Sequence, residues 1–197
     1  MAEDELNLFL DAMADVVPLD ATSKVNLVTA TIDQQQAQRY AATKKREALA
    51  RLSLELSEIP LRAPDEIICY RSEGIQSGVF KLFRQGKYQS QGMLDIKNSG
   101  LSRAREQLYD FIESSQRQGL RNVLIIHGTG VNNKPFPAQL KSAVAAWLPQ
   151  LSGVIAFHSA IKAQGGEGAL MVMLIKSETA RLNTRELTAK GGHLRFI

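Results

Sequence analysis

Apolar residues gather in the second half of the chain in four short runs and two longer stripes. The short runs are rich in β-branched side chains and are too short for buried helices, so they predict strands. They cover residues 92–96, 122–126, 154–158 and 169–175. The stripes at 102–118 and 137–148 repeat every three to four residues, so they predict amphipathic helices.

The order of these elements, β-α-β-α-β-β, predicts an α/β domain. A strand, a helix and a strand in such short succession form a βαβ unit, so strands 92–96 and 122–126 should be parallel. The two helices should then cover one face of a mixed four-stranded sheet, as a two-layer sandwich. We expect the helices to pack on the sheet through Leu108, Phe111, Val144 and Trp147.

The first half of the chain carries weaker patterns. Residues 3–17 have apolar side chains at helical spacing, which predicts a short helix that could dock on the main domain or on a protein partner. Residues 33–57 favour helix by composition but have a thin apolar face, so we expect an exposed helix or a partly disordered linker. Further along, residues 66–70 predict a short strand and residues 79–83 a short helix. We therefore divide the chain into an N-terminal helical extension and linker (1–60), a lead-in segment (61–91), a compact domain (92–176) and a basic tail (177–197).

Composition argues against several classes of protein. None of the apolar runs approaches the roughly 18 residues that a membrane span requires. The first residues are acidic where a signal peptide would be basic. The single cysteine, Cys69, cannot form an intrachain disulfide, and no Cys/His cluster has the spacing of a zinc site. We expect a cytoplasmic protein with no membrane partner. The cofactor stays open, and a divalent metal is compatible with the sequence.

Charge is distributed unevenly along the chain. Residues 1–20 contain six acidic side chains and no Lys or Arg, so the remaining 177 residues carry 24 basic and 14 acidic groups, a net charge of +10. A positive body of this kind predicts a polyanionic partner, and nucleic acid is the partner that we favour. The alternative is a basic surface that is merely solvated.

The residues best suited to chemistry follow strand 122–126. His127 ends the apolar run, and Gly128-Thr129-Gly130 come directly after it. Glycines allow positive φ and a close approach of a ligand to backbone N–H groups, and phosphate binds to such turns at the carboxyl ends of strands. His127 could then transfer a proton or contact phosphate. The alternative is a tight turn with an exposed histidine.

Further residues are expected near this turn. Asp95, a polar residue inside an apolar run, is either a catalytic group that orients His127 or holds a metal, or the acceptor for a nearby backbone turn. A second glycine loop, Gly165-Gly166-Glu167-Gly168, can reach the same place only if strand 169–175 is antiparallel to strand 122–126. Five cationic side chains are predicted phosphate contacts: Lys97, Arg103, Arg121, Lys134 and Lys162.

Together these residues resemble the Smr (small MutS-related) domain. The resemblance rests on Leu94-Asp95-Ile96, on Gly119-Leu120-Arg121, on residues 125–130 and on the loop 165–168, and it covers about residues 92–176. The leader and the lead-in segment are similar to those of stand-alone bacterial Smr proteins. The family implies a sandwich like the C-terminal domain of translation initiation factor three. It also implies nucleic-acid binding and, in several members, nicking of DNA or cleavage of RNA.

One of the two family motifs is altered in this sequence. The second motif, His-Gly-x-Gly, is intact at residues 127–130. In the first motif, Leu-Asp-Leu-His-Gly, Lys97 and Asn98 stand in place of the His and the Gly. A lysine can contact phosphate but is a poor general base at neutral pH unless burial lowers its pKa. The departure therefore bears on cleavage more than on binding.

The residues and the resemblance together predict a nucleic-acid-binding protein that acts as a DNA endonuclease, with His127 in proton transfer and Asp95 as the second catalytic residue. The substrate would be bound by Lys97, Arg103, Gly128, Thr129, Gly130, Lys134, Gly165, Gly166 and Gly168. DNA is favoured over RNA as the partner. The alternatives are an RNA endonuclease and a nucleic-acid or ribosome-binding module without catalysis.

Overall fold

The computed structural model describes residues 29–176. The chain separates into two compact units, residues 1–40 and residues 41–197, and the sheet belongs to the second unit. Of the first unit, the described residues form the opening turns of helix α2, Thr29–Arg51. The predicted helix at 3–17 and the predicted basic tail at 177–197 lie outside the described residues.

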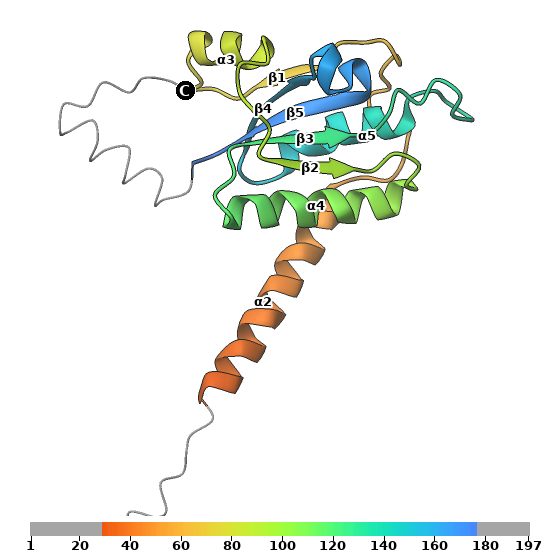
Figure 1. Cartoon of the computed structure of the whole chain (residues 1–197). Helices are drawn as coiled ribbons and strands as arrows, with labels where there is room; N and C mark the ends of the chain where they lie inside the picture. Colours follow the sequence, from red (N-terminus) through yellow and green to blue (C-terminus); the bar gives the residue numbers. More distant parts are fainter. Residues whose placement is uncertain (1–28, 177–197) are drawn as a thin grey trace, which may run out of the picture. The chain divides into compact units, whose positions relative to one another are not determined.

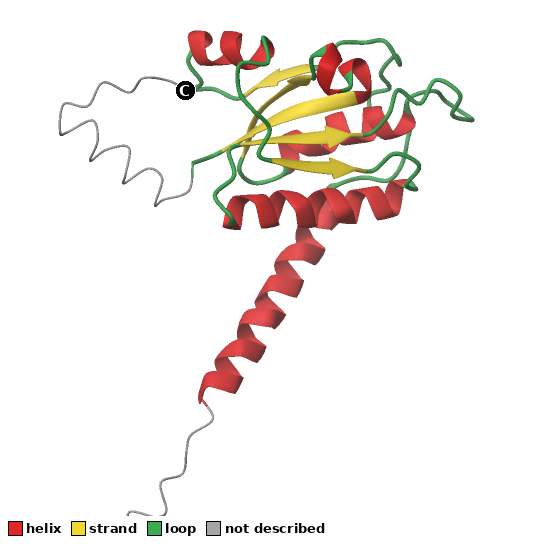
Figure 2. Cartoon of the chain, viewed as in Figure 1, coloured by secondary structure: helices red, strands yellow, loops and turns green. Residues whose placement is uncertain are grey.

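A five-stranded sheet forms the centre of the second unit (Figure 1, Figure 2). Its strands are β1 (Cys69–Arg71), β2 (Gly92–Asp95), β3 (Asn122–Ile126), β4 (Val154–Ser159) and β5 (Ala169–Leu174), in the spatial order β1-β4-β5-β3-β2. The predicted α/β class and the four strands predicted from the apolar runs are confirmed. The sheet has one strand more than predicted, because the short strand of the lead-in segment pairs with β4.

The strand directions place several chain segments at one edge of the sheet. β2 and β3 are parallel, as the βαβ pattern predicts, and Asp95 lies beside Ile126 at their carboxyl ends. β5 is antiparallel to both β3 and β4, and its first residue, Ala169, also lies beside Ile126. The carboxyl ends of β2, β3 and β4 therefore meet the amino end of β5. We call this the carboxyl edge of the sheet and the opposite one the amino edge.

Two helices, α4 (Leu101–Arg117) and α5 (Gln139–Trp147), pack on one face of the sheet, as predicted. Leu108, Val144 and Trp147 are completely buried, and Phe111 is partly buried against the same cluster. α5 begins two residues later than expected because Ala138 has a left-handed backbone with φ of 52°, which a helix cannot include.

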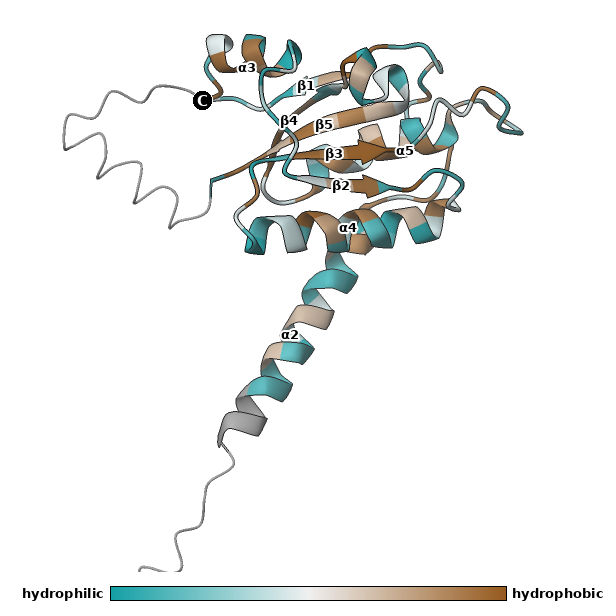
Figure 3. Cartoon of the chain, viewed as in Figure 1, coloured by the Kyte–Doolittle hydropathy of each residue, from teal (hydrophilic) through white to brown (hydrophobic). Residues whose placement is uncertain are grey.

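The opposite face is covered in part by α3 (Ser77–Arg84), a helix of the lead-in segment. Its Phe80 and Phe83 pack with Leu124, Met171 and Met173 of the sheet in a second apolar cluster. All six residues of β5 are buried, so both faces of this strand need cover. Figure 3 shows the central strands as largely apolar ribbons. The predicted two-layer sandwich thus gains part of a third layer.

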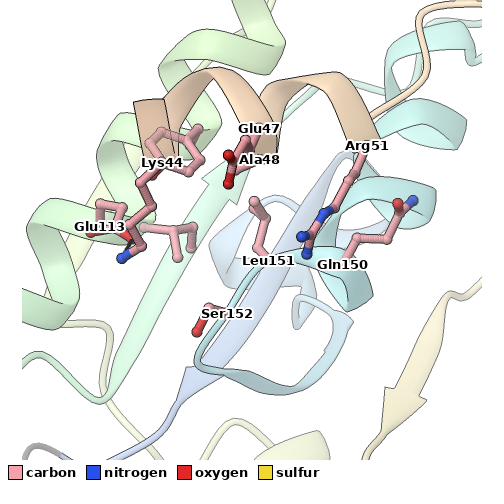
Figure 4. Close-up of a pocket in the computed structure, with 10 residues that line it drawn as sticks. Lys44, Glu47, Ala48, Arg51, Glu113, Gln150, Leu151 and Ser152 are labelled. Carbon is pink, nitrogen blue, oxygen red and sulfur yellow. Dashed lines mark hydrogen bonds and ion pairs between the residues drawn. The ribbon is translucent and has the colours of Figure 1, made fainter. Parts of the chain in front are cut away.

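The segment after α2 packs on the domain. Leu52 and Ile59 are buried in the main cluster, and the indole N–H of Trp147 donates to the Ser53 carbonyl at 2.8 Å. Before them, Lys44 forms a 2.9 Å ion pair with Glu113 of α4, beside a cavity of about 200 Å³ (Figure 4). Of the two interpretations of residues 33–57, the structure therefore shows the helix, which ends at Arg51 and is followed by packed chain.

Candidate functional site

The candidate site lies at the carboxyl edge, where the turn after β3 meets the loop before β5. The carbonyl of Gly168 accepts hydrogen bonds from the amides of His127 at 3.1 Å and Gly128 at 2.8 Å. Gly168 therefore lies directly against the turn, since a Cβ at this position would be in van der Waals contact with the Thr129 nitrogen at 3.4 Å. The prediction that the second glycine loop reaches the His127 turn through an antiparallel last strand is confirmed.

The turn itself, residues 127–130, leaves backbone donors unused. Gly128 and Gly130 have positive φ angles of 76° and 63°, which a residue with a side chain rarely adopts. The amides of Thr129 and Gly130 donate to no other residue of the described chain. The amide of Gly128, by contrast, is taken by Gly168. Two adjacent free amides in a glycine turn are the kind of donors that a phosphate-binding backbone nest uses.

The imidazole of His127 is buried, and only 3% of the residue is accessible to solvent. The alternative interpretation, a tight turn with an exposed histidine, is therefore wrong. Nδ1 lies 2.6 Å from the Gly128 carbonyl, and because a carbonyl only accepts, Nδ1 carries the proton. Nε2 therefore holds the lone pair, and it is buried without a hydrogen-bond partner in the described chain. Burial lowers the pKa of His127 from 6.5 to about 4, against the hydrogen bond to Gly128 and with a smaller contribution from the charge of Lys141. At neutral pH the ring is a neutral proton acceptor.

This burial predicts a pH-dependent stability. His127 stays unprotonated in the folded protein down to about pH 4, whereas the unfolded chain takes up the proton near 6.5. Between these values the unfolded state binds more protons, so the free energy of unfolding should fall with falling pH, by roughly 3 kcal/mol in all. Urea unfolding across this range measures the loss.

The control is His127→Gln, which cannot titrate and should flatten this part of the profile. The pKa of His158 is also lowered, first by burial, so the variant keeps the smaller slope that His158 contributes. Identical profiles for the variant and the wild type would contradict the assignment to His127.

Asp95 does not orient His127. Its Oδ1 accepts from the Lys97 amide at 3.0 Å, and its Oδ2 lies 3.2 Å from the Lys97 ammonium. Both side chains are about half exposed, whereas the His127 ring is buried and bonds only to Gly128 in the described chain. The structure thus shows Asp95 as the acceptor for a backbone turn, one of the two roles considered, and makes no link between Asp95 and the imidazole.

Four of the five predicted cations lie on segments of the carboxyl edge. The side chain of Lys97 lies beside the turn, because its Cγ would be 3.3 Å from a Cβ placed on Gly128. Lys134 is exposed in the loop 131–137, Arg103 in the first turn of α4, and Lys162 just before the second glycine loop. Arg121 is misplaced in the prediction: it precedes β3 at the amino edge, where its guanidinium donates to the Leu174 carbonyl.

The second glycine loop supports the turn but offers few donors of its own. The amides of Gly165, Gly166 and Gly168 donate to Lys162, to Ile161 and to Gly165. They are therefore occupied, and the direct substrate contacts expected of these three glycines would need those bonds to break. Their observed part is to hold the Gly168 carbonyl against the His127 turn.

Lys141 of α5 is a buried cation that is absent from the predicted site residues. It is fully buried, and its ammonium donates to the carbonyls of Pro64 at 2.8 Å and Glu66 at 2.6 Å. Burial lowers its pKa, while the nearby charges of Glu66, Glu167 and Asp65 act in the opposite direction. The sequence does indicate this burial, because Lys141 lies three residues before Val144 and so falls on the apolar stripe of its helix. Through these two hydrogen bonds, Lys141 links the lead-in segment to α5 near His127.

Residues 29–176 contain neither a metal-ligand cluster nor a membrane-spanning helix. No group of three or more His, Cys, Asp or Glu side chains there is placed to hold a metal ion. None of the helices in this range is long and apolar enough to cross a membrane.

Comparisons with known proteins agree on one family. The Smr domain model matches residues 94–175. A protein of Escherichia coli K12 named "Probable DNA endonuclease SmrA" is 37% identical over 187 residues, which is 95% of this chain and 97% of the relative. A "Ribosome rescue factor SmrB" of Tolumonas auensis is 30% identical over 87% of this chain and 93% of its own length. The crystal structure of YdaL, a stand-alone small MutS-related protein of Escherichia coli, aligns with a TM-score of 0.55 at 35% identity, covering 64% of this chain and 94% of that one.

Proposed function

The chain belongs to the Smr domain family, and from this we propose that it binds nucleic acid at the His127 turn and hydrolyses a phosphodiester bond there, as a DNA endonuclease. The observation that carries the proposal is the pair of free amides on Thr129 and Gly130, at an edge that also bears exposed lysines. DNA is preferred as the substrate because the relative with a DNA endonuclease name is the more similar of the two, 37% against 30% identical.

Binding rests on complementarity to one phosphate group. The amides of Thr129 and Gly130 would donate to its oxygens, and the hydroxyl of exposed Thr129 can add a third donor. Lys97 and Lys134 would supply positive charge, which is screened by salt because both are exposed. Lys97 stands where the family motif has His, and it acts here as a phosphate contact that Asp95 holds in place.

Cleavage would use the lone pair of His127. A buried polar atom without a partner costs roughly 1–3 kcal/mol, and such groups in folded proteins often have a functional role. We assign Nε2 as the acceptor for the proton of the attacking water, while the turn amides stabilise charge on the phosphate oxygens. Nε2 is enclosed, so this role requires the glycine turn to move when the phosphate binds.

A second candidate function is nucleic-acid or ribosome binding without cleavage. Two observations favour it: Lys97 replaces the histidine of the first family motif, and the imidazole of His127 is shielded from solvent. The relative named as a ribosome rescue factor points in the same direction. The two candidates share the same binding surface and differ only in turnover.

Binding should be strongly salt-dependent and should depend on charge at the carboxyl edge. In Lys134→Gln, the slope of log affinity against log salt should fall by about 0.7–0.9, the value for one lost phosphate contact. Fluorescence anisotropy of labelled single-stranded and duplex oligonucleotides across a sodium chloride series measures this slope.

The matched control is Arg117→Gln, which removes one exposed charge from the end of α4, at the amino edge. It should leave the slope unchanged. An affinity that does not vary between low and moderate salt, or equal losses in the two variants, would argue against binding at the turn.

A further inference from the structure

A second basic site lies on the other face of the sheet, between α3 and β4. A cleft of about 520 Å³ there is lined by Lys81, Arg84, Gln85 and His158. The cleft is distinct from the His127 turn. The imidazole of His127 lies within the fold on the side of α5, where the charge of Lys141 contributes to lowering its pKa.

The local sequence explains why these side chains gather. Phe80 and Phe83 anchor α3 on the sheet, and Lys81 and Arg84 each follow one of them in the sequence. Lys81 and Arg84 are three residues apart, so they project from the same side of the helix. His158 lies beside Met171 in the sheet register, and Met171 belongs to the cluster that α3 covers.

The charge of the cleft is not compensated. None of the lining residues is acidic, and within residues 29–176 neither Lys81 nor Arg84 has an ion pair or a side-chain hydrogen bond. Nδ1 of His158 lies 2.6 Å from the Ser159 carbonyl and so carries a proton, which leaves Nε2 as an acceptor. Two cations and an amide that can donate, collected in one hollow, form a site for an anion.

The cleft connects to the His127 turn through the loop before β5. At Gly86, which follows α3, a Cβ would lie 2.9 Å from the side chain of Ile161, so the end of α3 touches this loop. Lys162 comes next and is exposed, and the loop then ends at Gly168, whose carbonyl holds the turn. Cationic residues therefore occur on each segment between the cleft and the turn.

We propose that the α3–β4 cleft binds a second backbone phosphate of the nucleic-acid strand whose scissile phosphate occupies the His127 turn. The ligand class is a phosphodiester chain of several nucleotides, and a mononucleotide would fill only one of the two sites. This inference rests on the proposed function, because it takes the turn as the first phosphate site.

The double variant Lys81→Gln/Arg84→Gln tests the cleft with a labelled single-stranded oligonucleotide of roughly twelve nucleotides. Two lost phosphate contacts should lower the salt slope by about 1.4 on a single strand. Affinity at low salt should fall roughly 2- to 30-fold, the range for two exposed ion pairs. The control Arg46→Gln/Arg117→Gln removes the same charge from exposed positions on α2 and α4 and should bind like the wild type.

A second readout does not depend on affinity. The imidazole proton resonances of His158 should shift when the oligonucleotide is added to the wild-type protein, and should stay in place in the double variant. All variants should unfold at the same urea concentration as the wild type, because the substituted side chains are exposed.

The outcomes separate this inference from the proposed function. If the wild type binds no oligonucleotide at low salt, both fail. If the wild type binds and Lys134→Gln weakens binding, but the α3 double variant binds no more weakly than its control and His158 does not respond, the cleft is not a phosphate site and the turn still is.

Discussion

Phosphodiester cleavage by His127→Ala should be about 10²–10⁴-fold slower than by the wild type, the usual effect of losing general acid–base catalysis. Nucleic-acid affinity should change little, because the proposed phosphate donors are the amides of Thr129 and Gly130. The pKa of His127 near 4 in the free protein adds a second expectation: kcat/KM, which reports groups of the free enzyme, should not fall through titration of His127 between about pH 8 and pH 5. Nicking of supercoiled plasmid, with and without divalent metal, measures the rate.

His127→Asn separates catalysis from structure. Its side-chain N–H can still donate toward the Gly128 carbonyl, as Nδ1 does now, but an amide is no base. The Asn variant should therefore keep the turn and lose the cleavage. Undiminished cleavage in His127→Ala would place the chemistry elsewhere. If the wild type nicks no DNA and cleaves no RNA but binds either, the binding module without catalysis is the correct function.

Trp147→Ala should lower the free energy of unfolding by roughly 3–5 kcal/mol. The indole is completely buried between α5 and the segment after α2, and the substitution leaves a large cavity. It also leaves the Ser53 carbonyl without the indole N–H that now donates to it at 2.8 Å. Urea denaturation followed by far-UV circular dichroism measures the loss.

Two further substitutions divide this effect. Trp147→Phe keeps most of the side-chain volume. Its free energy of unfolding should therefore fall by only about 1 kcal/mol, mainly through the lost hydrogen bond to Ser53. Ile67→Ala removes an apolar side chain that is 64% exposed and should change stability by less than about 0.5 kcal/mol. A Trp147→Ala loss as small as that of Ile67→Ala would mean that the indole does not join the core as described.

Apolar periodicity was sufficient to predict most of the domain. The strands β3 to β5 and the helices α4 and α5 each bury several side chains, and apolar patterns record this burial. In β2 half-buried and exposed residues alternate, and Leu94 packs partly against the core. β1 is different, because it has three residues with only Tyr70 partly covered. Its place in the sheet depends on pairing with β4, some ninety residues away, which no local pattern encodes.

The site was predicted in position but not in detail. Gly128 and Gly130 indicated the turn, because glycine adopts positive φ angles that other residue types rarely adopt. The burial of the His127 ring depends on α5 and on the loop before β5, so the sequence next to it could not show it. The error on Arg121 was avoidable, because a residue that precedes a parallel strand lies at the amino edge, away from a site at the carboxyl edge.

The position of β5 has a consequence for how the protein is made. β5 is the last strand in the sequence, yet it lies between β4 and β3. A growing polypeptide can therefore pair β1 with β4 and β2 with β3, but no backbone pairing joins these two pairs of strands until β5 is available. The same late insertion delivers the Gly168 carbonyl to the His127 turn. An incomplete chain would lack both the complete sheet and the contact that shapes the turn, so under the proposed function nascent protein should not cleave nucleic acid.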